Sequence, residues 1–259
     1  MSSRPTRLLL AAFPPELAGL AGRLAGGWRA ACVGVGAVSA AAATARLLAE
    51  RRPERVLFVG TCGAYDARLA IGDHVSAAEA AATSLDEVEG RASRPEREPV
   101  RWRAGWELPF PAHVVAVTPG VTLSAAGARA LGRVAAAEHL ELAGVFAACS
   151  AAGVPAAAAL AVANRVGPGA RAEWKANHRR VSRELGEALR ALVRMREREG
   201  EARRLRVAAL APPPVAGTAA EWRAAAAARS ATRKRRSSLT SRTAASTRSR
   251  AMESTSRPT

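Results

Sequence analysis

The chain has 259 residues, of which 49% are hydrophobic, and its formal net charge is +17. That length allows one α/β domain of ordinary size or two small ones, with enough apolar residues for a real core. No apolar run approaches the roughly 18 residues that span a bilayer, and the N-terminal apolar segment is short. We therefore expect no signal peptide and no membrane contact. The three cysteines are widely spaced in apolar or small-residue sequence, so we expect reduced thiols and a cytoplasmic protein.

The positive charge is concentrated at the end of the chain. Residues 200–259 carry 13 Lys and Arg side chains against three Asp and Glu. Because this stretch is built mainly of Ser, Thr, Ala and Arg, we expect a domain over residues 1–205 and a disordered basic tail over 206–259. The cluster Arg233–Arg236 only weakly suggests a nucleic-acid partner, and we prefer a solvated tail.

The first half of the chain predicts a βαβ unit. Residues 7–13 form an apolar run that ends at two prolines, and a helix should follow from Pro15 with Leu17, Leu20 and Leu24 on one face. Next come a strand from Trp28, a glycine turn, an alanine-rich helix that stops near Pro53, and a buried strand. This order implies two parallel strands with a helix packed across them.

The second half continues with alternating strands and helices. We expect strands over residues 74–84 and 112–119, a loop over 86–103, helices over 124–135 and 141–153, an apolar strand over 156–167, and a final helix over 173–203.

A small glycine segment follows the buried strand directly. It consists of Gly60, Thr61, Cys62 and Gly63, which we interpret as a turn. Ligands of α/β proteins bind at the carboxyl ends of strands, where glycine lets backbone N–H groups approach an anion or a sugar. The alternative is a tight turn that needs glycine only for its dihedral angles.

The segment Gly34-Val35-Gly36 approximates a dinucleotide-binding fingerprint, because it follows a strand and opens a helix. Such a site also needs an acidic residue at the end of the next strand, where this chain has the neutral Gly60-Thr61-Cys62 segment. We therefore do not favour nicotinamide binding, and we expect no cofactor.

Two acidic residues, Glu138 and Glu141, flank His139-Leu140 at the opening of a predicted helix. Acidic side chains in a first helical turn complement the helix dipole. An apolar run follows Glu141 at once, so at least one carboxylate should face the interior, where it needs a partner such as the hydroxyl pair of a ligand. The cysteines and histidines have no spacing that indicates a metal site.

Four blocks in order resemble the nucleoside phosphorylase and nucleosidase superfamily: GVGAVSAAAATARLL, VLFVGTCGAYDARLAIGDHV, AEHLELAGVFAACSAAGVP, and AVANRVG with EWKANH beyond it. The resemblance covers residues 7–200 and is greatest to the branch of futalosine hydrolase and the methylthioadenosine/S-adenosylhomocysteine nucleosidases. It implies a three-layer α/β/α fold around a mixed central sheet, a nucleoside substrate and a homo-oligomer.

The resemblance also implies roles for individual residues. Glu16 would orient a water molecule, Asn164 would hydrogen-bond the purine, and Glu141 would accept the ribose hydroxyls. The family methionine before that glutamate is Leu140 here. The remaining predicted substrate contacts are Glu138, Leu140 and the backbone of Gly60, Thr61, Cys62 and Gly63.

Three further positions depart from the family pattern. Phe58 stands where the phosphorylases have a phosphate-binding arginine, and Leu160 and Ala163 stand where nucleosidases commonly have arginine and serine. The resemblance therefore implies hydrolysis of a purine nucleoside at its N-glycosidic bond. A phosphorolytic enzyme and a non-catalytic nucleoside-binding paralogue remain as alternatives.

Overall fold

The computed structural model describes residues 6–20, 27–95 and 100–210, with residues 193–210 described as backbone. The chain divides into two units, residues 1–195 and 196–259. The expected tail lies outside the described residues from residue 211 onward. No described helix combines the length and the apolar character that crossing a bilayer requires.

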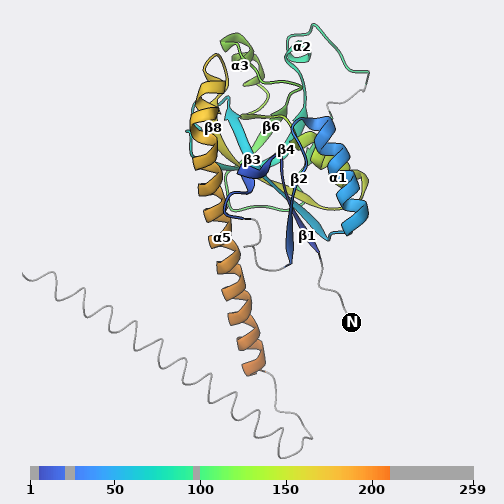
Figure 1. Cartoon of the computed structure of the whole chain (residues 1–259), viewed down its shortest axis with the longest axis vertical. Helices are drawn as coiled ribbons and strands as arrows, with labels where there is room; N and C mark the ends of the chain where they lie inside the picture. Colours follow the sequence, from blue (N-terminus) through green and yellow to red (C-terminus); the bar gives the residue numbers. More distant parts are fainter. Residues whose placement is uncertain (1–5, 21–26, 96–99, 211–259) are drawn as a thin grey trace, which may run out of the picture. The chain divides into compact units, whose positions relative to one another are not determined.

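One mixed sheet forms the centre of the first unit (Figure 1). Its strands are β1 (Arg7–Ala11), β2 (Trp28–Cys32), β3 (Arg55–Ala64), β4 (His74–Ala82), β5 (Arg101–Arg103), β6 (Ala112–Val117), β7 (Ala137–His139) and β8 (Ala156–Arg165). The helices are η1 (Pro14–Leu17, a 3₁₀ turn), α1 (Ala37–Arg51), α2 (Leu85–Val88), α3 (Ala125–Leu131), α4 (Leu142–Ala151) and α5 (Ala170–Leu210).

β3 is the strand on which the sheet is organised. It lies parallel to β1 and β8, and its last residues pair antiparallel with β7. β8 also pairs with β4, β4 pairs with β6, and β6 pairs with β7. The strands β3, β8, β4, β6 and β7 therefore form a closed ring, and β1 and β2 extend it on one side as parallel strands.

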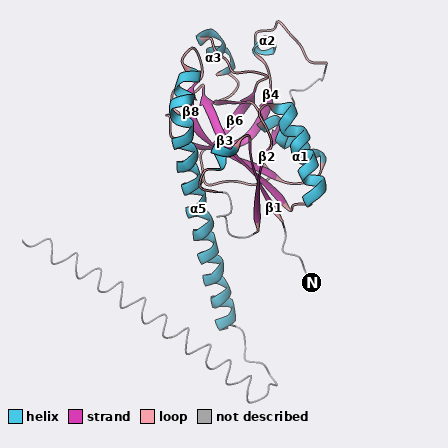
Figure 2. Ribbon diagram, in the orientation of Figure 1, coloured by secondary structure: helices cyan, strands magenta, loops and turns pink. Residues whose placement is uncertain are grey.

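Two apolar clusters separate the sheet from the helices on either side. One cluster joins the sheet to α1 and α4, through side chains such as Leu47 and Phe146. The other joins the opposite face to α5, through Val181, Leu185 and Leu189. Figure 2 shows α1 and α5 on opposite sides of the strands. The predicted three-layer α/β/α fold with a mixed sheet is confirmed.

Two local predictions near the N-terminal half are wrong. The helix expected from Pro15 is only the 3₁₀ turn η1, because consecutive prolines remove two N–H donors and Gly19 adopts a φ of 78°. Leu24 lies outside the described residues. The predicted turn at Gly60–Gly63 is the continuation of β3, which pairs with β8 and β7 along that segment.

Short elements account for the other differences. The expected loop over 86–103 contains most of α2 and all of β5, and β7 lies where we expected a helix to open. Three- and four-residue elements are too short for a hydrophobic period to emerge, so pairing with neighbours decides their structure. The final helix begins at Ala170 and continues to Leu210.

Candidate functional site

The carboxylate of Glu16 lies at the carboxyl ends of β1 and β3. Its Oε2 accepts the backbone N–H of Ala12 at 3.1 Å. Its Oε1 accepts the backbone N–H of Thr61 at 2.8 Å and the Thr61 hydroxyl at 2.9 Å. Since β1 and β3 are parallel, their ends meet at one edge, and η1 returns Glu16 to that edge. This is where α/β sheets bind ligands.

Burial controls the protonation of Glu16. The side chain is only 4% exposed, and this desolvation raises its pKa from 4.5 to about 7. The hydrogen bonds from Thr61 and Ala12 oppose that rise, whereas the nearby charge of Glu141 adds to it. A carboxyl group with a pKa near 7 can take up and release a proton at neutral pH, as a general acid or base must.

A second carboxylate, Glu141, precedes α4. Its Oε1 accepts the backbone N–H of Gly36 at 2.8 Å, so the glycine loop before α1 holds it. The Nδ1 atom of His139 lies 3.2 Å from the other oxygen of Glu141 and accepts the backbone N–H groups of Glu141 and Leu142. Burial lowers the pKa of His139. The ring is therefore neutral, with its proton on Nε2, and this contact is not an ion pair.

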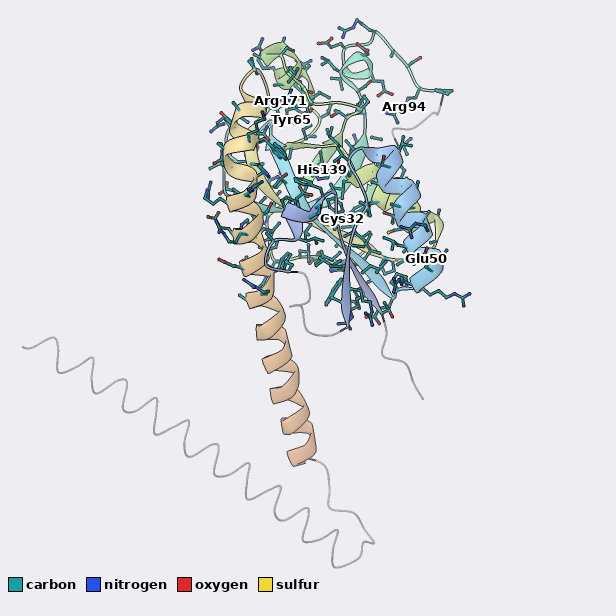
Figure 3. All side chains as sticks on the ribbon, viewed as in Figure 1. Cys32, Glu50, Tyr65, Arg94, His139 and Arg171 are labelled. Atoms are coloured by element: carbon teal, nitrogen blue, oxygen red, sulfur yellow. The ribbon has the colours of Figure 1, made fainter. Side chains whose placement is uncertain are left out.

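Side chains from three elements, η1, β3 and β7, lie close together around Gly60. A Cβ atom at this position would lie 2.9 Å from Cε1 of Phe58, 3.1 Å from Nε2 of His139 and 3.4 Å from Oε1 of Glu16. The His139 ring also contacts Phe58 edge-on, with ring centroids 5.2 Å apart, and lies over the middle of the strands (Figure 3). We call Glu16, Thr61, His139 and Glu141 the carboxylate cluster.

The helix on the opposite face reaches this cluster through Trp174. Its indole Nε1–H donates to the Thr61 hydroxyl at 3.1 Å. Its ring stacks on His178 with centroids 4.1 Å apart and an interplanar angle of 9°, and it contacts Phe13 at 5.9 Å. The first turns of α5 are thus connected to the carboxyl end of β3.

Asn164 lies at the end of β8, beside the end of β3. It is buried, and its Nδ2 donates to the carbonyl of Arg165 at 3.0 Å. A Cβ atom on Gly63 would lie 2.9 Å from Nδ2 of Asn164, so glycine is needed for this close approach. Asn164 is therefore held at the same edge as the carboxylate cluster. Its contact with a base stays a prediction.

Glu138 has protein partners. Its carboxylate accepts the hydroxyl of Tyr65 at 2.7 Å and both the hydroxyl and the backbone N–H of Thr122, with a longer contact to Thr118. These bonds attach the segment after β6 to β7 and to the end of β3. Substrate contact by Glu138 stays a prediction, as it does for the half-buried Leu140.

The remaining predicted positions are apolar or uncharged. Cys62 is buried, which raises its pKa to about 12, so its thiol is protonated at neutral pH. Phe58, Leu160 and Ala163 are completely buried. In the part of the chain that the structure describes, His, Cys, Asp and Glu side chains form no group of three able to hold a metal ion.

Sequence reasoning missed two residues of this site. His139 carried no motif, although its position between Glu138 and Glu141 was a signal that it shares their surroundings. Trp174 is 113 residues from Thr61, and only the packing of α5 against the sheet brings the two together. The EWKANH block contains Trp174, so the family resemblance pointed to the segment without indicating its contact.

Comparison with known proteins gives one family and a consistent fold. A family model described as the phosphorylase superfamily matches residues 20–194. No sequence among the curated proteins matches the chain.

Similar solved structures include a futalosine hydrolase of Helicobacter pylori, with 16% identity, a TM-score of 0.65, and coverage of 74% of this chain and 98% of that one. A methylthioadenosine/S-adenosylhomocysteine nucleosidase of the same species has 17% identity, a TM-score of 0.65, and coverage of 75% and 100%. The corresponding nucleosidase of Colwellia psychrerythraea, in complex with adenine, has 19% identity, a TM-score of 0.63, and coverage of 74% and 95%.

Proposed function

Because the chain belongs to the phosphorylase superfamily, we propose that it hydrolyses the N-glycosidic bond of a purine-type nucleoside and releases the free base. The observation that carries the proposal is the Glu16 carboxyl, which is buried at the carboxyl ends of β1 and β3 and has a pKa of about 7. The neighbouring structures support the substrate class, since their names include futalosine and methylthioadenosine.

The proposed reaction uses each group of the site for one task. Cleavage of the bond develops positive charge on the ribose and negative charge on the departing base. Glu16 orients a water molecule at the sugar and accepts a proton from it as the water attacks. Glu141 accepts hydrogen bonds from the ribose hydroxyls. Asn164 hydrogen-bonds the base, and the backbone of Gly60–Gly63 lines the pocket.

Water rather than phosphate is the proposed nucleophile. A phosphate dianion in a partly dry pocket needs positive charge or several aligned donors. Phe58 is completely buried and offers neither at the family's arginine position. His139 is neutral because burial lowers its pKa, and the two carboxylates Glu16 and Glu141 repel an anion. These features together favour a neutral nucleophile.

The test is incubation with purine nucleosides that include methylthioadenosine and futalosine, with chromatographic detection of free base and sugar. We expect free sugar and the same rate in phosphate-free buffer and in about 50 mM phosphate. Glu16→Gln should lower turnover roughly 100-fold. The matched control is Glu50→Gln, an exposed position on α1, which should leave the rate unchanged. Release of the sugar as its 1-phosphate would refute hydrolysis.

A second candidate is a nucleoside-binding protein without catalytic activity. It is favoured by Leu160 and Ala163, since loss of a guanidinium and a hydroxyl removes polar contacts worth about 0.5 to 3 kcal/mol each. Binding of a nucleoside without release of base, measured by calorimetry, would support this candidate.

Two further parts of the proposal concern assembly and location. We propose a cytoplasmic homo-oligomer, because the resembling family completes its pockets with residues of a neighbouring copy. Sedimentation at micromolar concentration tests the assembly, and a monomer would contradict it.

A further inference from the structure

The hydroxyl of Thr61 has two hydrogen-bond partners in the site. The Nε1 atom of Trp174 lies 3.1 Å from the Thr61 oxygen, and Oε1 of Glu16 lies 2.9 Å from it. An indole N–H can only donate, so the Thr61 oxygen is the acceptor of that bond. The single hydroxyl proton is then left to point at Glu16.

We propose that Trp174 is a positioning residue that directs the Thr61 hydroxyl proton at Oε1 of Glu16 and so fixes the orientation of the carboxylate. The inference rests on the proposed role of Glu16 in the reaction. Thr61 donates to Oε1 from both its backbone N–H and its hydroxyl, at 2.8 and 2.9 Å. This pair of donors leaves the Glu16 carboxylate little freedom to turn.

Trp174 is itself held on several sides. Its ring lies flat on His178, one turn later in α5, and the Nδ1 atom of His178 is 2.9 Å from the Trp174 carbonyl oxygen. The ring also contacts Phe13, the N-cap residue of η1, which lies three residues before Glu16. Trp174 therefore touches both segments that place the carboxylate, η1 through Phe13 and β3 through Thr61.

The direction of the Thr61 bond matters because the other surroundings of Glu16 oppose its ionisation. Burial is the largest cause of its raised pKa, and Glu141 adds negative charge. Neutral His139 and the thiols of Cys32 and Cys62 face it from the other strands, and His178 lies beyond Trp174. The bonds from Thr61 and from Ala12 act in the opposite direction and lower the pKa.

The first experiment replaces Trp174 by Phe, which removes the N–H and keeps an aromatic ring. The readout is the titration of the ¹³C-labelled Glu16 carboxyl by NMR, assigned by the loss of its signal in Glu16→Gln. We expect the pKa to rise by about 0.5 to 1, as the loss of one hydrogen bond in the network implies. Trp106→Phe is the matched control, since Trp106 packs at the edge of the apolar cluster under α5 and should leave the titration unchanged.

Variants of Thr61 distinguish the effect of the Trp174–Thr61 hydrogen bond on the Glu16 titration from the effect of Trp174 packing. Thr61→Val should raise the pKa of Glu16, and the double variant with Trp174→Phe should show no further rise. In Thr61→Ser, which keeps the hydroxyl, Glu16 should titrate as in the parent. An unchanged titration in Trp174→Phe, or the same rise with and without the Thr61 hydroxyl, would overturn the proposal. If Trp174→Phe does not fold, benzothienylalanine at this position keeps the shape of the side chain and lacks the N–H.

The kinetic readout is the acidic limb of the profile of kcat against pH. In Trp174→Phe this limb should shift to higher pH by the same amount as the pKa that NMR measures for Glu16. KM should stay within about twofold of the parent. Absence of any nucleoside cleavage by the parent would contradict the proposed function alone, because the NMR titration still decides the role of Trp174.

Discussion

Replacement of Glu16 by Gln should make the protein more stable at alkaline pH and less active. The pKa of this carboxyl is 4.5 ordinarily and about 7 in the folded chain. Between these values the folded protein keeps a proton that the unfolded chain has released, so its stability falls as the pH rises through this window. A shift of one pKa unit corresponds to about 1.36 kcal/mol. Ionisation of Glu16 above pH 7 therefore lowers the free energy of unfolding of the parent by about 3 kcal/mol.

Glutamine avoids this cost but introduces a smaller one. Its carbonyl oxygen can keep the two bonds from Thr61, whereas its NH₂ group then faces the N–H of Ala12, which now lacks an acceptor. The lost bond costs about 1 kcal/mol at every pH. By pH 5, just above the ordinary pKa of 4.5, the parent has already lost somewhat less than about 1 kcal/mol, which offsets the lost bond. We therefore expect Glu16→Gln to be about 2 kcal/mol more stable than the parent at pH 8 and of nearly equal stability at pH 5.

Thermal unfolding of both proteins at pH 5 and pH 8 measures the difference. For a domain of this size, 1 kcal/mol corresponds to about 2 to 4 °C in Tm. Glu50→Gln is the control for the exposed side of α1, where the side chain forms an i,i+4 pair with Arg46, and this change should alter the free energy of unfolding by only a few tenths of a kcal/mol. A Glu16→Gln effect that is the same at both pH values would refute a proton-retaining carboxyl.

Three further changes test other features. Gly60→Ala should destabilise the protein by about 1 to 3 kcal/mol, because the added methyl would press on the rings of Phe58 and His139. Gly120→Ala is the control, since the space around Gly120 is open, and melting curves of the two variants should show the difference. Tyr65→Phe removes one donor to buried Glu138 and should cost about 1 to 3 kcal/mol in urea unfolding. Removal of residues 206–259 should leave Tm within a few degrees, because their composition offers little apolar surface to bury; a larger drop would contradict this.

The layers of the fold could be predicted because their signals are long. The alanine-rich α1 and the apolar β3 and β8 extend over 10 to 15 residues, and the position of α1 between β2 and β3 indicates the βαβ unit. The Gly60–Gly63 segment was misread because glycines at the end of an apolar run are equally consistent with a turn. Here they serve close packing within a strand, against His139 and Asn164.

The site could be predicted only in part. Glu16, Glu141 and Asn164 came from motif positions, and the structure places all three at strand or helix ends at the edge of the sheet. The interactions that set their chemistry are non-local. The bond of Trp174 to Thr61 and that of Gly36 to Glu141 join residues more than 100 positions apart, and no local pattern encodes them.

The central position of β3 has a consequence for how the molecule acquires its site. Its partners β1 and β8 come from opposite ends of the first unit, and β7 closes the ring in between. The carboxylate cluster therefore draws on residues from 16 to 141, and Trp174 reaches Thr61 from near the end of the unit. Chains with so many distant contacts fold slowly, and a fragment that ends before Glu141 lacks part of the cluster. Activity should then appear as the last event of folding, which makes its recovery after denaturation a measure of completed assembly.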